Sequence, residues 1–367
     1  MFERWSSFLK FFSLDSTQGR FKKTLKSLSL FFGAFIVLSL SGCLQSKGVL
    51  NPGGLVAKKE KVLLFEALAI MLIVVIPVIV MSIAFAMRYR KHRHNKSKYR
   101  PEWSHSTLLE AFWWGVPTVI IIVLAIITWK TSHAYDPYRH ISSKDEQSQI
   151  AHSSKKPLVI EAVSLRWKWL FIYPDQSIAT VNTLTIPKDT PVEFKLTSEA
   201  PMTAFFIPRL ASQVYVMAGM QTKLNLISDK IDTYEGKNAQ YNGPGFGWNT
   251  FKVHVVSSKD FRQFITHTKS THNVLSTQKY VKSIWSKLND SKAFPEMTFS
   301  HVNVDLYHCI IQKYHLPLAD NSPFSKQYYR NRLENNPELK NSCAFQLYNL
   351  EKKYPQMYDP KSQHRAH

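Results

Sequence analysis

Glu110 is the residue of this sequence best placed for proton chemistry, because it begins an apolar stretch, 110–131, long enough to cross a membrane. An ionised group is expensive there, so a carboxylate beside a span suggests a function. It could gather protons and pass them on through water. The alternative is an acid in the first turn of a helix, stabilised by the helix dipole, with Ser106 or Thr107 as the cap. The residues alone leave both interpretations open.

Cys43 is a candidate for lipid attachment. It follows Leu40-Ser41-Gly42 at the end of the largely apolar stretch 28–39, and the basic residues of segment 20–26 precede that stretch. This order is typical of a bacterial lipoprotein signal, in which the cysteine is acylated and becomes the new N-terminus. The sequence therefore predicts a signal peptide over 1–42. An uncleaved anchor with an incidental cysteine is the alternative.

The two remaining cysteines, Cys309 and Cys343, lie late in the chain. A disulfide between them would persist in an oxidising compartment, and two unpaired thiols fit the sequence equally well. Cys309 stands among His301, His308 and His315, whose seven-residue spacing can place them on one helical face. The histidines could hold a metal ion. An exposed amphipathic face is the favoured reading, because no supporting residues can be named for a metal site.

Two apolar segments, 62–87 and 110–131, are predicted to span a membrane, with Glu66 at the interface near the outer end of the first. The loop 88–109 between them carries seven lysines and arginines, which predicts that it stays in the cytoplasm. Segment 43–61 and everything beyond the second span are then periplasmic. Basic clusters beside the spans account for much of the net charge of +21, and no nucleic-acid-binding motif accompanies them.

The soluble part is predicted to be rich in β-strands. After the connector 132–156, short runs of alternating polar and apolar residues separated by turn residues predict a β-sandwich or barrel over 157–258. Segment 266–315 is rich in aromatic residues and is predicted to be mostly helical, and the basic tail 316–367 shows little periodicity. The predicted fold class is thus membrane α plus all-β, with a two-helix transmembrane hairpin, a sandwich and a helical extension.

Several motifs are specific in combination and support a family resemblance. They are Glu110-Ala111-Phe112-Trp113-Trp114-Gly115-Val116-Pro117, Ser164-Leu165-Arg166-Trp167-Lys168-Trp169, Phe205-Phe206-Ile207-Pro208-Arg209-Leu210, Met217-Ala218-Gly219-Met220-Gln221-Thr222 and Asn242-Gly243-Pro244-Gly245-Phe246. From about residue 43 to 314 the chain resembles subunit II of the haem-copper respiratory oxidases, in particular the ubiquinol-oxidising branch of the cytochrome bo type. The resemblance implies a cupredoxin-like sandwich in the periplasm.

The strongest sign of that branch is a set of residues that cannot bind copper. In relatives that accept electrons from cytochrome c, a loop with the pattern Cys-x-Glu-x-Cys-x-x-x-His-x-x-Met and an upstream histidine bind a dinuclear copper centre. The corresponding positions here are Thr203, Asn238, Gln240, Asn242, Phe246 and Asn249. Such a centre needs thiolate and imidazole ligands, so the sequence predicts no metal and no cytochrome c partner.

The resemblance also implies a function. The complex would oxidise ubiquinol, reduce oxygen to water and pump protons, with haems and copper in a catalytic subunit I and with smaller membrane subunits as further partners. This chain would carry no redox cofactor, and Glu110 would lie at the entrance of a proton channel. It would reside in the bacterial inner membrane, in contact with lipid. The alternatives are a periplasmic scaffold or binding lipoprotein that reuses the fold, or a cytochrome c oxidase subunit II with copper bound elsewhere.

Four further residues have both a structural and a functional interpretation. Trp167 and Trp169 lie on a strand whose tryptophan receives electrons in the cytochrome c branch, but packing in an aromatic core is the favoured role. Met217 and Met220 could suggest a replacement copper site, and packing in the core or at an interface is favoured because no cysteine or histidine lies near them in sequence.

Overall fold

The computed structural model describes residues 48–89, 102, 104–134, 136–139, 156–199, 202–285, 293–315 and 342–353. The chain divides into two compact units, Met1–Asn51 and Pro52–His367. Only residues 48–51 of the first unit are described, so the predicted signal peptide and Cys43 lie outside the described residues. The fold described below belongs to the second unit.

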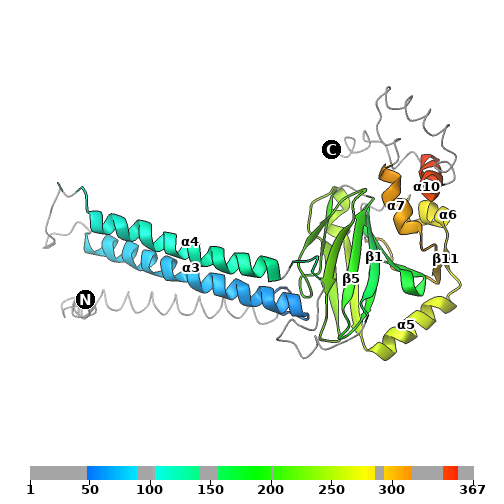
Figure 1. The fold of residues 1–367 in the computed structure, drawn as a ribbon, viewed down its shortest axis with the longest axis horizontal. Helices are drawn as coiled ribbons and strands as arrows, with labels where there is room; N and C mark the ends of the chain where they lie inside the picture. Colours follow the sequence, from blue (N-terminus) through cyan, green and yellow to red (C-terminus); the bar gives the residue numbers. More distant parts are fainter. Residues whose placement is uncertain are drawn as a thin grey trace, which may run out of the picture. The chain divides into compact units, whose positions relative to one another are not determined.

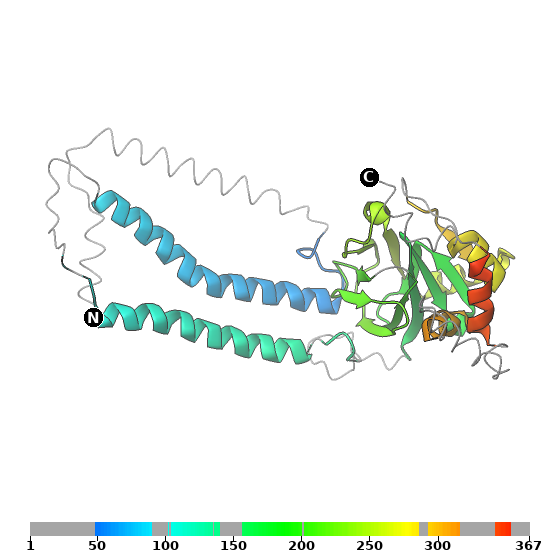
Figure 2. The same ribbon diagram turned by 90° about the horizontal axis from the view of Figure 1, so that it is seen from above.

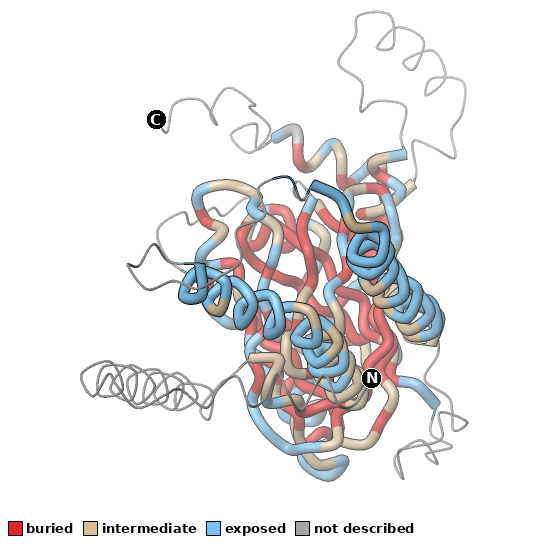
Figure 3. The backbone as a smooth tube through the Cα atoms, turned by 90° about the vertical axis from the view of Figure 1, so that its left-hand side faces the viewer, coloured by how far each residue is buried: buried red, intermediate tan, exposed pale blue. Residues whose placement is uncertain are grey.

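Two long apolar helices begin this unit. Helix α3, Leu55–Arg88, has 34 residues, and helix α4, Thr107–Ala134, has 28. Both are long and apolar enough to cross a membrane, and at 1.5 Å per residue α3 is ~51 Å long, which exceeds a ~30 Å hydrocarbon core. Most of their residues are exposed in the isolated chain (Figure 3), as expected of surfaces that lipid or a partner would cover. Each contains the predicted span, and each extends beyond it at both ends.

The strands form two main sheets that face each other. The six-stranded sheet has the order β12 (Met297–Phe299), β3 (Ile178–Val181), β2 (Lys168–Tyr173), β1 (Leu158–Leu165), β5 (Val192–Ser198) and β8 (Thr222–Leu226). The five-stranded sheet has the order β4 (Thr183–Pro187), β10 (Thr250–Val256), β9 (Asp232–Asn238), β6 (Thr203–Phe206) and β7 (Val214–Val216). Most neighbours are antiparallel, and β1 with β5 and β10 with β4 are parallel.

An aromatic core fills the space between these sheets. The rings of Trp169, Phe205 and Phe251 lie at its centre, with ring centroids 5.1 to 5.6 Å apart. All three are buried. Burying rings of this size supplies much of the stability of a sandwich.

The chain after the sandwich covers the outer face of the six-stranded sheet (Figures 1 and 2). The first of its elements is α5 (Ser258–Ser270), whose Phe261 packs into the core between the two main sheets and not on this outer face. The elements of the outer layer are β11 (Val274–Leu275), α6 (Thr277–Lys279), the π-helix η3 (Tyr280–Trp285), β13 (His301–Val302), α7 (Leu306–His315) and α10 (Cys343–Lys352). Two short 3-10 helices, η1 (Pro174–Gln176) and η2 (Pro244–Trp248), lie within the sandwich. The outward-facing Val163, Leu165 and Leu170 pack against this layer in a second core. The predicted order of two apolar helices, a sandwich and a helical C-terminal region is therefore confirmed.

One helix, α10, was not predicted. It lies in the tail 316–367, for which little periodicity is visible in the sequence. Ala344 and Leu347 are buried on its inner face, and the Ser342 hydroxyl caps its first turn by accepting a hydrogen bond from the Phe345 N–H at 3.2 Å. At least this part of the tail is an ordered component of the second core.

The beginning of α3 is built into the sandwich. The Gly53 N–H donates to the Arg209 carbonyl at 2.7 Å, and the Gly53 carbonyl accepts from the Ser228 hydroxyl at 2.9 Å. Lys58, one turn into α3, pairs with Asp229. These bonds fix the first turn of the membrane helix to the loops that follow β6 and β8.

Candidate functional site

Glu110 lies in the first turn of α4, as predicted. Its N–H donates to the Ser106 carbonyl at 3.0 Å, and its side chain is half exposed. The Oε2 atom lies 3.6 Å from Nδ1 of His105, whose Nε2 is 3.3 Å from the Thr107 hydroxyl. A carboxylate and an imidazole therefore lie side by side at the end of the span, and both groups can take up protons from water and release them.

The six copper-ligand positions of the resemblance lie at the ends of β6 and β9 and in the loop that contains η2. Thr203 begins β6, Asn238 ends β9, and Asn249 follows η2. The Asn238 N–H donates to the Asn249 carbonyl at 2.9 Å. The fold thus brings at least these positions together, with hydroxyl and amide groups where a copper centre needs thiolates and imidazoles.

The Asn238 side chain holds this region together by hydrogen bonds. Its Oδ1 accepts from the N–H groups of Ala204 at 2.8 Å and Gln240 at 2.9 Å, and its Nδ2 donates to the Gln240 carbonyl at 2.7 Å. Asn238 is almost completely buried, so these bonds satisfy backbone groups that water reaches poorly. One amide therefore links strand β6 to the loop, as a shared metal would link its ligands.

Trp167 packs against the same loop from the β1–β2 turn. It adopts φ 57°, a left-handed conformation that is costly for a bulky residue. A methyl group on Gly245 would lie 2.2 Å from Cδ2 of the Trp167 ring, so the indole rests directly on the glycine backbone. Trp169 is fully buried in the aromatic core. Both tryptophans are therefore in packing contacts.

Some polar atoms of the loop have no partner among the described residues. Asn249 is fully buried, and neither its Oδ1 nor its Nδ2 is hydrogen-bonded there, which is also true of the Thr203 hydroxyl. Buried polar groups of this kind commonly bind ordered water. The remaining positions, Gln240, Asn242 and Phe246, are half-buried, and the Phe246 ring lies 5.6 Å from that of Tyr241.

The other candidate metal ligands do not converge. His301 is on strand β13, whereas His308 and His315 are on α7, so the predicted possibility of three histidines on one helical face is wrong. The strand forms because His301 and Val302 pair with β11. Met217 and Met220 are exposed. In the part of the chain that the structure describes, no group of three or more His, Cys, Asp or Glu side chains could hold a metal ion.

Sequence reasoning missed a buried charged cluster under the C-terminal layer. The Lys313 amine on α7 donates to Glu199 at the end of β5 at 2.6 Å and to Glu351 of α10 at 2.7 Å. The Tyr280 hydroxyl also donates to Glu199. All three charged side chains are at most 3% exposed. The sign of this cluster in the sequence is Lys313, a charged residue on the otherwise apolar inner face of α7.

The electrostatics of this cluster follow from burial and from its surplus of carboxyl groups. Burial raises the pKa of Glu351 to about 8, with a further increase from Glu199 and an opposing effect of Lys313. Burial would lower the pKa of Lys313, but Glu199, Tyr314 and Glu351 outweigh it, so the net pKa is raised. These shifts favour a charged Lys313 and a protonated Glu351 near neutral pH.

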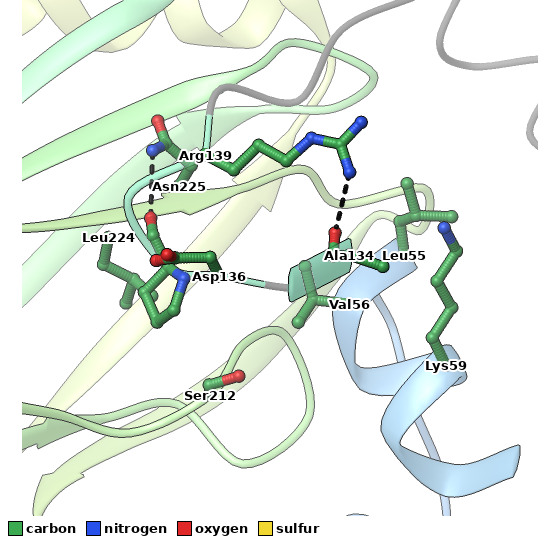
Figure 4. A pocket seen from close by; sticks show the side chains of 10 residues that line it. Leu55, Val56, Lys59, Ala134, Asp136, Arg139, Ser212, Leu224 and Asn225 are labelled. Atoms are coloured by element: carbon green, nitrogen blue, oxygen red, sulfur yellow. Dashed lines mark hydrogen bonds between the residues drawn. The ribbon is translucent and has the colours of Figure 1, made fainter. Parts of the chain in front are cut away.

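A small cleft of about 30 Å³ lies where α3 and α4 meet the sandwich (Figure 4). Leu55 and Lys59 of α3 line one side, and Asn225 of β8 donates to the Pro137 carbonyl at 3.0 Å on the other. The Arg139 guanidinium donates to the Ala134 carbonyl at 3.2 Å and so closes over the end of α4. This cleft has room for about one water molecule and marks the junction of both helices with the soluble domain.

Comparison with known proteins gives the same family for helices and sandwich. The family model described as "Cytochrome C oxidase subunit II, transmembrane domain" matches residues 54–131. The cytochrome bo(3) ubiquinol oxidase subunit 2 of Pseudomonas aeruginosa is 44% identical over 279 residues, which are 76% of this chain and 78% of that protein. The ubiquinol oxidase subunit 2 of Acetobacter aceti is 40% identical over 292 residues, 80% of this chain and 90% of that protein.

Solved structures show a weaker likeness. The periplasmic domain of subunit II of cytochrome oxidase from Bradyrhizobium japonicum is 18% identical with a TM-score of 0.31, covering 32% of this chain and 96% of that chain. The identities to the curated relatives and their coverage, together with two apolar helices followed by a sandwich, establish the family. The chain belongs to the subunit II family of the haem-copper oxidases, among the ubiquinol oxidase subunits 2.

Proposed function

We propose that this chain is subunit II of a proton-pumping terminal oxidase that oxidises ubiquinol and reduces oxygen to water. The observation that carries the proposal is the loop that contains η2, where Asn238 and Asn249 are buried at positions that correspond to metal ligands in cytochrome c-oxidising relatives. Amides of this kind cannot replace thiolates in a copper relay. Ubiquinol, which is delivered within the membrane, needs no such relay, and the curated relatives carry the name of ubiquinol oxidases.

The chain itself supports assembly rather than electron transfer. Helices α3 and α4 present apolar surfaces that fit a membrane partner, namely the catalytic subunit I, and the smaller membrane subunits complete the complex. Haems and copper would reside in subunit I and perform the redox chemistry. The hydrogen bonds at Gly53 would hold the soluble domain at a fixed position over the membrane helices.

Glu110 would serve proton uptake. It lies at the end of α4 that follows the basic loop, and that loop would face the cytoplasm. Its exposed carboxylate and the neighbouring His105 can take protons from water and deliver them towards a channel in subunit I. Glu110 is thus the residue of this chain most directly involved in proton transfer.

The proposed location is the bacterial inner membrane, with the sandwich and the C-terminal layer in the periplasm. The lipoprotein pattern that ends at Cys43 supports cleavage after residue 42 and a lipid anchor at the new N-terminus. Two spanning helices and the anchor would then attach the chain to the same membrane.

Oxygen consumption by the complex purified through this subunit tests the proposal. Cyanide-sensitive turnover is expected with ubiquinol and not with reduced cytochrome c. Turnover with cytochrome c would contradict the proposed donor and require a copper site elsewhere. A haem-free preparation that uses neither donor would instead indicate a periplasmic scaffold lipoprotein.

A further inference from the structure

Helices α7 and α10 are joined by a cysteine pair. Cys309 on α7 and Cys343 at the start of α10 form a disulfide with their Cα atoms 5.6 Å apart, a separation that suits the bond. The two residues are 34 positions apart in the sequence. A covalent bond therefore closes a long loop at the edge of the second core.

Lys313 supplies a second attachment on the same side of α7. It follows Cys309 by four residues, so the two side chains point from neighbouring turns of one helical face. Its amine is 2.7 Å from Glu351 near the end of α10 and 2.6 Å from Glu199 on the sheet. A disulfide at one end of α10 and an ion pair at the other hold the helix against α7.

Between these attachments α10 contributes apolar side chains to the second core. Leu347 is fully buried among residues of the π-helix and α7, and Leu350 packs at the margin. If α10 moved away, the side chains of Lys313, Glu199 and Cys309 would become more exposed to solvent. The attachments and the apolar contacts are therefore parts of one arrangement.

We propose that Cys309 and Cys343 are oxidised by a periplasmic protein that carries a reactive disulfide. The bond that they form acts as a latch, because it holds α10 over the second core. One cysteine thiolate attacks the disulfide of the donor, forms a mixed disulfide and releases one donor thiol. The second cysteine thiolate attacks the mixed disulfide, which forms the Cys309–Cys343 bond and releases the donor with both sulfurs reduced. Two electrons and two protons pass from the cysteines to the donor.

The burial of Cys309 sets the order of these events. It is only 2% exposed when α10 is in place, so an attacking disulfide protein cannot reach it there. Exchange at Cys309 therefore precedes the docking of α10, and docking then shields the Cys309 sulfur from reducing thiols, whereas Cys343 stays partly exposed. This proposal rests on the periplasmic location given above and not on the identity of the electron donor.

The test uses the whole complex, purified through this subunit without reductant. Free thiols are blocked with an alkylating reagent in denaturant, and the peptides that contain Cys309 and Cys343 are mapped by mass spectrometry, so that Cys43 does not interfere. The linked pair is expected to exceed the alkylated peptides by about tenfold or more, and the ratio should reverse in cells that lack the periplasmic disulfide donor. Quantitatively alkylated Cys309 and Cys343 from normal cells would overturn the proposal.

Docking is tested separately on the reduced native complex. Alkylation of Cys309 is expected to be slow and to accelerate about tenfold in Leu347→Ala, because the variant weakens the cover. Gln346→Ala, on the exposed side of the same helix, is the matched control and should leave the rate unchanged. Wild-type Cys309 that reacts as fast as a cysteine in an unfolded peptide would refute the proposed order.

Ubiquinol-driven oxygen consumption is measured on the same preparations. Free cysteines in a complex with normal turnover would refute the latch alone. A formed disulfide in a complex that does not oxidise ubiquinol would support the latch and contradict only the proposed function.

Discussion

The amine of Lys313 on α7 lies 2.7 Å from Oε1 of Glu351 on α10, and both side chains are almost completely buried. Glu199 on the sheet binds the same amine at 2.6 Å, so one positive charge faces two carboxyl groups in a poorly hydrated space. Such a group of charges keeps an extra proton rather than a second negative charge. We therefore expect the stability of the C-terminal layer to depend on pH.

The stability of this layer is expected to fall as the pH rises. Burial raises the pKa of Glu351 from 4.5 to about 8, so between these values the folded state retains a proton that the unfolded state releases. The free energy of unfolding should therefore decrease from about pH 5 to about pH 8 and level off above. Glu161, whose pKa burial raises to about 7, contributes in the same direction, and Lys313 stays protonated throughout. Hydrogen exchange in residues 343–352 measures the change.

Glu351→Gln identifies the responsible group. The variant should match the wild type near pH 5, be more stable near pH 8, and show a shallower pH dependence, because the amide can still accept from Lys313 without adding charge. Glu235→Gln, at an exposed position of the central strand β9, is the control and should retain the wild-type profile. A variant that loses stability at pH 8 would contradict the raised pKa.

Asn238→Ala should destabilise the loop that contains η2. It leaves the N–H groups of Ala204 and Gln240 without their buried acceptor, at a cost of about 2–4 kcal/mol for the two groups. Thermal unfolding and hydrogen exchange in residues 239–249 are the measurements. Gln240→Ala is the control, since the Gln240 bonds to Asn238 come from its backbone. Equal effects of both substitutions would mean that the Asn238 amide does not hold the loop.

Gly245→Ala should destabilise the protein because the added methyl group would clash with a neighbouring ring. The new methyl group would lie 2.2 Å from the Trp167 ring, so the loop or the indole must move, at a cost of about 1–3 kcal/mol. At Gly247 a methyl group meets no atom within 4 Å among the described residues, so Gly247→Ala is a control in the same loop. Comparison of the melting temperatures and tryptophan fluorescence of both variants distinguishes the clash from a general effect of alanine.

Glu110→Gln should slow ubiquinol-driven oxygen consumption while the complex still assembles. The amide keeps the shape of the side chain but cannot exchange a proton, so a loss of about tenfold is expected if this residue begins the uptake path. Glu102→Gln, an exposed glutamate in the preceding loop, is the control and should turn over normally. Unchanged turnover of an assembled Glu110→Gln complex would assign Glu110 to the helix dipole instead.

Much of the fold could be predicted from local sequence patterns. Unbroken apolar runs mark α3 and α4, and alternation marks strands such as β10, because each pattern reflects one environment along one element. His301 was placed on a possible helical face because its spacing from His308 suits a helix, but pairing with β11 makes it part of a strand. The spacing of residues in the sequence shows which secondary structures are possible, and pairing with a distant strand determines which one forms.

The candidate sites could be predicted only where one residue carries the chemistry. The proposed role of Glu110 and the copper-incompatible residue types at Asn238 and Asn249 can be read from the sequence because single residue types suffice, and both stay predictions. The Lys313 cluster is not, since its partners are 114 and 38 residues away and charged residues usually lie at the surface. The role of the Asn238 amide as a bridge also required coordinates.

The hydrogen bond between Gly53 and Ser228 has a consequence for biogenesis. These residues are 175 positions apart, and Gly53 lies immediately before the first membrane helix. In the proposed topology, the Gly53 segment would reach the periplasmic side of the membrane before Ser228 is translocated, and its backbone polar groups would be hydrated until then. The contact between Gly53 and Ser228 can form only after both helices have been inserted and β8 has emerged on the same side of the membrane. In the proposed topology, inversion of a single helix would keep Gly53 and Ser228 on opposite sides of the membrane, so this hydrogen bond would form only after correct insertion of both helices.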